Sequence, residues 1–214
     1  MNTFDALNQR ISANFFDTER KLSSQQLTDL INYAQQAPSA FNIQHSRYLV
    51  VTDQSAKEQL KSIAFNQQKV SDASAVIIVL ADERGHERMP DIAQQGVDQG
   101  IYDNNVRDYF VNATQGAYAD NPTAAHDEAL RSASLAAMNL MTAATAMGLA
   151  SGPMIGFDSA QLKQTFNIGE RYNPAMMIAV GYARPGNWQK KPRLAAAQVA
   201  VMDVRPARDH ALSS

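Results

Sequence analysis

Three apolar runs, each bounded by polar residues, constrain the fold of this chain more than any other feature. They cover residues 47–52, 73–81 and 175–182, and aliphatic side chains dominate each of them. Short runs that are apolar throughout, rather than alternating, are typical of strands buried on both faces. Helical patterns separate the runs along the chain, so the sequence predicts a layered domain of the α/β or α+β class.

The helical patterns have recognisable beginnings and ends. Apolar residues recur at helical spacing over residues 27–34, after a pairing of Ser23 with Gln26 that is typical of a capping box. This helix should end at Ala37, because the residue before Pro38 avoids the helical conformation. Other helices are expected over residues 56–63, over residues 124–147, and after Asp158, where Gln161 fits a second cap.

No internal repeat or low-complexity linker divides the sequence, which predicts one domain over residues 1–214. Residues 84–123 are polar, and their aromatic side chains follow no strong period, so we expect a long irregular excursion there. It is either a solvated surface insertion or a lid that gives a substrate pocket an aromatic wall. Residues 195–214 are expected to form a C-terminal arm.

Composition excludes several classes of function. The chain has no cysteine, which rules out disulfides, thiolate catalysis and Cys-ligated metals. Any redox chemistry therefore needs a bound cofactor. A net charge of −2 gives no reason to expect nucleic acid or an anionic membrane as a partner. No apolar stretch reaches the ~20 residues of a membrane helix, and the first residues do not resemble a secretion signal, so we expect a soluble cytoplasmic protein.

Familiar catalytic and nucleotide-binding motifs are also missing from the sequence. It contains no Gly-x-Gly-x-x-Gly dinucleotide loop, no Walker-type phosphate loop and no Gly-x-Ser-x-Gly elbow. The four histidines lack metal-ligand spacing and are expected to be surface or packing residues. No side chain stands out as a general acid or base, so neither a catalytic residue nor a metal site is predicted.

Two basic segments near opposite ends of the chain have the side chains to bind a phosphate. The first contains Arg10, Ser12 and Asn14, and the second contains Lys191 and Arg193. Cations together with hydroxyl or amide donors are what a phosphate dianion requires. Taken singly, each residue also fits a solvated helix or a basic surface loop, so the interpretation depends on the remaining segments.

Three further segments complete the pattern. They are residues 38–42, 66–69 and 153–157, which read Pro-Ser-Ala-Phe-Asn, Asn-Gln-Gln-Lys and Pro-Met-Ile-Gly-Phe. The order and spacing of all five segments resemble the nitroreductase family of FMN-dependent oxidoreductases, from about Phe4 to about Leu194. The resemblance implies an α+β fold in which helices flank a central, mostly antiparallel sheet. It also implies a homodimer that binds FMN non-covalently.

The resemblance assigns the FMN phosphate to the two basic segments. In the family the first motif lies on the N-terminal helix and reads Arg-x-Ser-x followed by a cation. Here Asn14 replaces that cation, which removes one charge from the expected site. The residues expected to take part are Arg10, Ile11, Ser12, Asn14, Lys191 and Arg193.

The flavin ring is assigned to two of the other segments. Lys69 resembles the family lysine that stabilises negative charge at N1 and O2 of the reduced ring. Asn66 resembles the residue that hydrogen-bonds N3 and O4. A backbone amide of Ile155 or Gly156 is expected to face N5. The turn that carries this amide consists of Pro153, Met154, Ile155, Gly156 and Phe157.

Residues 38–42 resemble the segment that reaches the flavin from the partner subunit. Phe41 stands where family members often carry a small or hydroxyl residue, so it is expected to contact the substrate together with Tyr109 and Phe110. The cofactor contacts expected from this segment are Pro38, Ser39, Ala40 and Asn42.

The implied function is the NADH- or NADPH-dependent reduction of small electron-poor acceptors such as nitroaromatics, quinones or enals. Because the sequence has no dinucleotide loop, donor and acceptor would use one pocket in turn, which is a ping-pong scheme. Two alternatives stay open. One is an FMN store or redox sensor in which Phe41 blocks the ring, and the other is a protein that keeps the fold without the cofactor.

Overall fold

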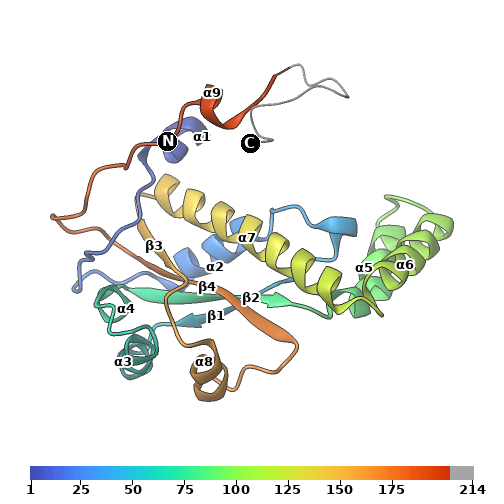
Figure 1. Cartoon of the computed structure of the whole chain (residues 1–214), viewed down its shortest axis with the longest axis horizontal. Helices are drawn as coiled ribbons and strands as arrows, with labels where there is room; N and C mark the ends of the chain where they lie inside the picture. Colours follow the sequence, from blue (N-terminus) through green and yellow to red (C-terminus); the bar gives the residue numbers. More distant parts are fainter. Residues whose placement is uncertain (203–214) are drawn as a thin grey trace.

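A computed structural model describes residues 1–202 of the chain. Figure 1 shows its helices and strands. In chain order they are α1 (Thr3–Gln9), α2 (Ser24–Ala34), the short 3-10 helix η1 (Ala40–Asn42), β1 (Ser46–Val51), α3 (Gln54–Ile63), α4 (Lys69–Asp72), β2 (Ala75–Asp82), the 3-10 helix η2 (Gly85–Arg88), α5 (Met89–Asp98), α6 (Asn104–Tyr118), α7 (Pro122–Ala146), β3 (Ala150–Met154), α8 (Ser159–Thr165), β4 (Tyr172–Gly181) and α9 (Ala196–Val199).

The strands form one four-stranded sheet in the order β1–β2–β4–β3, and every neighbouring pair is antiparallel. All residues of β2 are buried, which confirms the strand predicted there to be buried on both faces. It pairs with β1 through Leu49 and Ile78, and with β4 through Ile77 and Ile178. The expected α+β fold with a central antiparallel sheet is therefore confirmed.

Strand β3 is absent from the sequence-based prediction. It reads Ala-Ser-Gly-Pro-Met, and both glycine and proline are disfavoured in strands. The strand forms at the edge of the sheet, where Pro153 is tolerated because one side of the strand needs no ladder hydrogen bond. Pro174 of β4 is tolerated for a related reason. It pairs with Leu80 of β2, and the pairing of the two strands shifts register between Val79 and Leu80.

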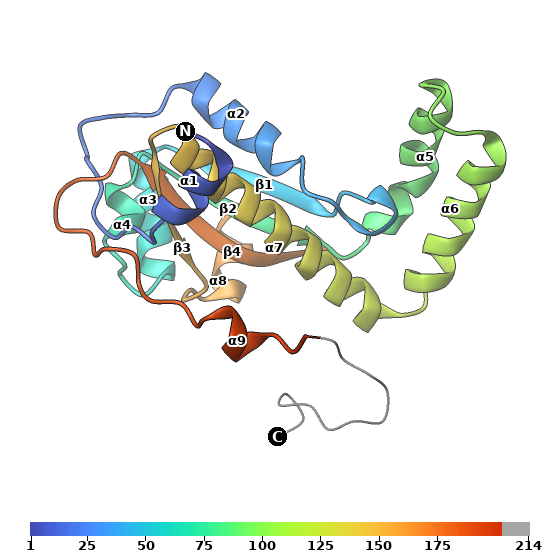
Figure 2. The ribbon, with the colours of Figure 1, turned by 90° about the horizontal axis from the view of Figure 1, so that it is seen from above.

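Helices cover both faces of the sheet (Figures 1 and 2). Helices α2 and α7 pack on one face, and α3, α4 and α8 pack on the other. Small side chains such as Ala133 and Ala137 line the buried face of α7, the long helix expected over residues 124–147. Ser23 and Gln26 form the predicted capping box of α2. Within residues 1–202 no helix is both long and apolar enough to cross a membrane.

The expectation of an irregular excursion over residues 84–123 is wrong. Most of this segment forms η2, α5 and α6, and the two α-helices make a hairpin that projects beyond the end of the sheet (Figures 1 and 2). Its helical period is weak because small or polar residues, among them Gly96 and Thr114, occupy buried positions. Gly96 is required there, because a β-carbon would lie 2.1 Å from the ring of Tyr102.

The N-terminal helix ends before the motif that was expected to lie on it. Arg10 is the C-cap of α1 and leaves the helical conformation, with φ −58° and ψ 123°. Ser12 lies beyond the helix and forms a parallel bridge with Ser151 of β3. Of the expected C-terminal arm, α9 and the residues up to 202 are described, and residues 203–214 lie outside the described residues.

Candidate functional site

A cavity of about 230 Å³ lies between the segment after α1, the start of α4 and the segment after β4. Its walls bring together residues from both ends of the described chain. The lining residues are Arg10, Ile11, Ser12, Asn14, Lys69, Trp188, Gln189, Lys190, Lys191 and Arg193. All of them except Trp188, Gln189 and Lys190 were expected from the sequence to bind the cofactor.

The N-terminal wall of the cavity, formed within residues 10–14, is held in place by strand β3. The backbone N–H of Ala13 donates to the carbonyl oxygen of Ser151 over 2.9 Å, next to the bridge between Ser12 and Ser151. Gly152 permits this close approach, because a β-carbon there would lie 2.4 Å from the carbonyl oxygen of Ala13. The same edge strand therefore holds the residues that flank Ala13 at the cavity.

The C-terminal wall of the cavity, formed within residues 188–193, is joined to the N-terminal wall by the hydrogen bonds of Asn187. Its Oδ1 accepts from the backbone N–H groups of Asn14 and Phe15, over 2.8 and 3.1 Å. Its Nδ2 donates to the carbonyl oxygen of Phe15 over 2.8 Å. Lys190 adds a bond from its Nζ to the carbonyl oxygen of Leu7. These contacts join segments that are more than 170 residues apart in the sequence.

The cavity is strongly positive. Five of its lining residues are cations, and none of the lining side chains is acidic. Within residues 1–202 none of these five cations takes part in a salt bridge. Lys191 instead lies over the ring of Trp188 at 4.8 Å, and Arg193 donates to two carbonyl oxygens of its own segment. Uncompensated positive charge with a hydroxyl donor suits a small anion of high charge.

Lys69 is a half-buried cation of the cavity, at the first position of α4. Its aliphatic chain passes Gly152, with Cδ 3.5 Å from the position of a β-carbon there. Burial lowers the pKa of the Lys69 ammonium, and no carboxylate of the described residues opposes that shift. A desolvated, unneutralised ammonium of this kind favours negative charge placed beside it.

The two segments expected at the flavin ring lie side by side. The Nε2 of Gln67 donates to the carbonyl oxygen of Gly156 over 2.8 Å, which ties residues 66–69 to the turn after β3. Asn66 is exposed and adopts a left-handed conformation with φ 59°. Ile155, in this turn, is 78% exposed. Lys69 also lines the cationic cavity, so it connects the two arrangements.

Residues 38–42 do not line the cavity. Their 3-10 helix η1 packs near the α5–α6 hairpin, and the backbone N–H of Ala40 donates to Oε1 of Glu128 on α7. The ring of Phe41 meets Phe110 edge-on at 6.1 Å, and Tyr109 lies 5.8 Å from Phe110. The three residues expected to contact substrate thus form one aromatic cluster, away from the cationic cavity within this chain.

The sequence as a whole is similar to known proteins. Residues 7–182 match the model of the nitroreductase family. The chain belongs to this family. A candidate NAD(P)H nitroreductase of Bacillus subtilis, YodC, is 36% identical to this family member over 182 residues, which cover 85% of the chain and 90% of YodC. A second one from the same organism, MhqN, is 37% identical, with coverage of 82% and 85%.

Solved structures resemble this nitroreductase family member over nearly its whole length. A candidate nitroreductase from Exiguobacterium sibiricum, solved in complex with FMN, superposes with a TM-score of 0.88 at 31% identity, covering 94% of this chain and 97% of the other. The enone reductase CLA-ER, from gut-bacterial fatty acid metabolism, superposes with a TM-score of 0.83 at 25% identity, covering 94% and 98%.

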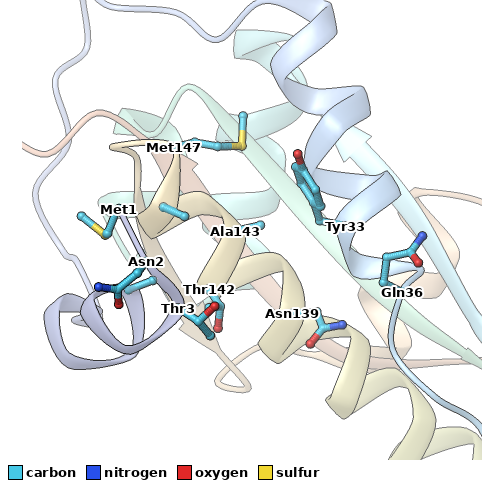
Figure 3. Close-up of a pocket in the computed structure, with 11 residues that line it drawn as sticks. Met1, Asn2, Thr3, Tyr33, Gln36, Asn139, Thr142, Ala143 and Met147 are labelled. Carbon is cyan, nitrogen blue, oxygen red and sulfur yellow. The ribbon is translucent and has the colours of Figure 1, made fainter.

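A larger cavity, of about 490 Å³, lies between α1, α2 and α7 of this nitroreductase family member (Figure 3). Its lining is mostly apolar, with amide and hydroxyl groups from residues such as Asn139, Thr142 and Tyr33. No charged side chain lines it, and none of the residues expected to bind cofactor or substrate is part of it. The smaller cavity is therefore the candidate site, because it combines positive charge with the residues expected to bind the cofactor, although the other cavity is larger.

The sequence-based prediction missed three lining residues and two supporting ones. Trp188, Gln189 and Lys190 directly precede the predicted Lys191, so the cavity-lining segment begins earlier than expected. Asn187 and Gly152 support the walls without lining the cavity. The lone tryptophan beside a run of basic residues was a signal that could have extended the prediction, but nothing in the sequence shows which distant backbone Asn187 binds.

Proposed function

We propose that this nitroreductase family member is an FMN-dependent oxidoreductase that takes electrons from NADH or NADPH. The observation that carries the proposal is a cluster of cations around one cavity, none of which forms a salt bridge within residues 1–202. The names of the Bacillus relatives support the nicotinamide donor, and the Exiguobacterium complex supports the cofactor.

The donor set of the cavity fits the phosphate of FMN. Arg10, Lys191 and Arg193 supply positive charge, and Ser12 supplies a hydroxyl. Lys190 adds a cation that the sequence pattern did not include, which offsets the charge missing at Asn14. A phosphate monoester is close to a dianion, and multiple charge-assisted hydrogen bonds are its usual ligands in proteins.

Bound FMN would supply the ring that accepts and donates hydride. This chain's contribution is to place charge and backbone donors around that ring. Lys69 provides a half-buried ammonium that has no carboxylate partner within residues 1–202, which favours negative charge in its neighbourhood. The turn at Ile155 and Gly156, held by Gln67, offers backbone amides on the same side. No acid or base needs to be assigned from the cavity, since protons can come from water.

We further propose that the acceptors are small and electron-poor, such as nitroaromatics, quinones or enals. The cluster of Phe41, Tyr109 and Phe110 offers flat apolar surface against which planar acceptors can pack. The likeness to an enone reductase supports acceptors with a C=C bond conjugated to a carbonyl group, a class that includes enals. Donor and acceptor would occupy one site in turn, in a homodimer whose second subunit brings residues 38–42 to the flavin.

The test uses the only tryptophan of the sequence, Trp188, as a reporter on the cavity wall. Apoprotein is titrated with FMN while tryptophan fluorescence is followed, and saturable quenching is expected. The loaded protein is then mixed anaerobically with NADH or NADPH, and rapid bleaching of the flavin absorbance is expected. Reoxidation by a quinone or a nitroaromatic would complete the proposed cycle.

Two other outcomes would contradict the proposal at different points. Quenching without bleaching by either donor would indicate an FMN store or redox sensor, and Phe41 would be the first residue to replace. A protein that shows no quenching with FMN would not be a flavoprotein of the proposed kind.

A further inference from the structure

Lys57 is a buried cation outside the cavity. It lies on α3, is 1% exposed, and forms no salt bridge with any residue of the described range 1–202. Its Nζ donates to two carbonyl oxygens, those of Ser71 at 3.1 Å and Ala73 at 2.6 Å. The inner face of α3 is otherwise apolar, with Leu60 and Ile63 in the core, so an aliphatic residue would suit this position for packing alone.

The two carbonyl groups belong to the end of α4, a helix of one turn. Helix C-termini leave carbonyl oxygens without intrahelical partners, and a lysine can satisfy them. Helices α3 and α4 lie side by side in both views of the fold (Figures 1 and 2). Because Ala73 leads directly into β2, Lys57 fixes the junction between α4 and the centre of the sheet.

The opposite end of α4 carries Lys69. The backbone N–H of Ala73 donates to the carbonyl oxygen of Lys69 over 3.1 Å, so the two ends of this single turn are directly bonded. Gln67 anchors the preceding residues to Gly156. Helix α4 is therefore held by Gln67 at its beginning and by Lys57 at its end, and the Lys69 side chain extends from it into the cavity.

We propose that Lys57 is a positioning residue. It holds the terminal carbonyl groups of α4 and thereby fixes the position of Lys69 at the other end of this helix. The inference rests on the proposed function, because Lys69 matters here through its place beside bound FMN. Burial lowers the pKa of Lys57 and the positive charge of Lys21 adds to this shift, while Asp72, Glu58 and Asp53 oppose it. The contacts of Nζ within the described residues are the carbonyl oxygens of Ser71 and Ala73.

The first experiment compares Lys57→Met with Leu60→Ala, a core substitution on the same helix that touches neither carbonyl group. In apoprotein, amide hydrogen exchange over residues 70–73 should accelerate in the Lys57 variant beyond the general acceleration seen in the Leu60 variant. FMN affinity, read from Trp188 fluorescence, should fall by about three- to tenfold. This is the effect of losing one ordinary hydrogen bond, because a displaced Lys69 would no longer contact FMN. Lys57→Gln, which keeps a shorter donor, replaces the Met variant if that variant fails to fold.

The second experiment is a double-mutant cycle with Lys69→Met, read as the reduction potential of bound FMN. The Lys57 substitution should lower the potential when Lys69 is present and leave it unchanged when Lys69 is already replaced. Leu60→Ala should change the potential in neither background. An equal effect of the Lys57 substitution on the potential in both backgrounds, or no effect in either, would overturn the positioning role. The proposed function would still stand in that case, provided that the unaltered protein binds FMN. Failure of the unaltered protein to bind FMN would overturn both.

Discussion

Arg193 is a cation of the cavity, and among the described residues its guanidinium bonds its own segment, through Nη1 to the carbonyl oxygens of Lys191 and Pro192. Replacing it with alanine should remove a charge-assisted phosphate contact of about 1.5–3 kcal/mol, which weakens FMN binding roughly tenfold or more. The change is measured by titrating apoprotein with FMN and following Trp188 fluorescence.

Arg184→Ala is the matched control for that measurement. Arg184 is exposed in the same part of the chain, but it lies over the ring of Phe15 at 5.2 Å and does not line the cavity. Its replacement should leave FMN affinity unchanged. Equal affinities for the Arg193 variant and the unaltered protein would remove Arg193 from the phosphate site.

Lys69 should act on the redox properties of the cofactor more than on its affinity. Lys69→Met removes a desolvated positive charge, and negative charge on the reduced ring then loses its stabilisation. The reduction potential of bound FMN should fall by about 30 mV or more, since 30 mV corresponds to ~1.4 kcal/mol for two electrons. Spectroscopic titration against a reference dye measures it, and an unaltered potential would place Lys69 away from N1 and O2.

Single residues of the site could be read from the sequence where they carry distinctive chemistry. Arg10, Ser12 and Lys191 were predicted because, together with the other motif segments, they resemble the family pattern, whereas each of them alone also fits a solvated surface. Asn187 and Gly152 were not, because their importance depends on which distant backbone lies against them. The assignment of each predicted residue to a part of FMN stays a prediction.

At the scale of elements, the loop residue Tyr102 packs against both helices of the α5–α6 hairpin. The ring of Tyr102 lies against Gly96 of α5 and meets Phe110 of α6 edge-on at 5.5 Å. Gly96→Ala should push the ring away, because the new β-carbon would lie 2.1 Å from it. Amide hydrogen exchange within residues 89–118 should then accelerate, while the amides of β2 keep their protection.

Gly116→Ala is expected to stabilise the same hairpin that Gly96→Ala disturbs. Apart from its chain neighbours and the backbone of its own helix, no atom of the described residues lies within 4 Å of a β-carbon at Gly116, which is in α6. Alanine there should slow exchange, since it improves helix stability by about 0.5–1 kcal/mol over glycine. If both substitutions changed exchange in the same direction, the packing of Tyr102 on Gly96 would not be what holds the hairpin.

The elements themselves were predictable to different degrees. Strand β2 and helix α7 were predicted because long apolar patterns and good helix formers agree with their final environment. Strand β3 was missed because its pairing with β4 overrides the poor strand propensity of Gly152 and Pro153. The hairpin was taken as irregular because its contacts use glycine and aromatic edges rather than a stripe of aliphatic residues.

At the scale of the whole molecule, stability should depend on pH through His45. This side chain is fully buried, its Nδ1 donates to the carbonyl oxygen of Asp82 over 2.8 Å, and its Nε2 has no hydrogen-bond partner among the described residues. Burial lowers the pKa of His45 from 6.5, although Glu128 and Asp82 oppose the shift and His86 adds to it. The ring of Tyr118 also packs against it.

The sign of the effect follows from the lowered pKa. Below pH 6.5 the unfolded chain binds a proton at His45 that the folded chain does not, so the free energy of unfolding should decrease as pH falls below that value. The decrease is at most about 1.4 kcal/mol per pH unit. His45→Asn, which keeps a donor near Nδ1, should flatten the profile of denaturant unfolding between about pH 7 and pH 5. An unchanged profile would mean that other groups control the acid sensitivity.

The cationic cavity also has a consequence for how the protein is made. Asn14 and Asn187, whose contact closes its two walls, are 173 residues apart. At a synthesis rate of ~5–20 residues per second, the second wall is translated about 9–35 s after the first. All four strands of the sheet leave the peptidyl-transferase centre before it does. The two walls can therefore be joined only after the residues of the whole sheet have been synthesised, and we expect capture of FMN to be a late event of maturation.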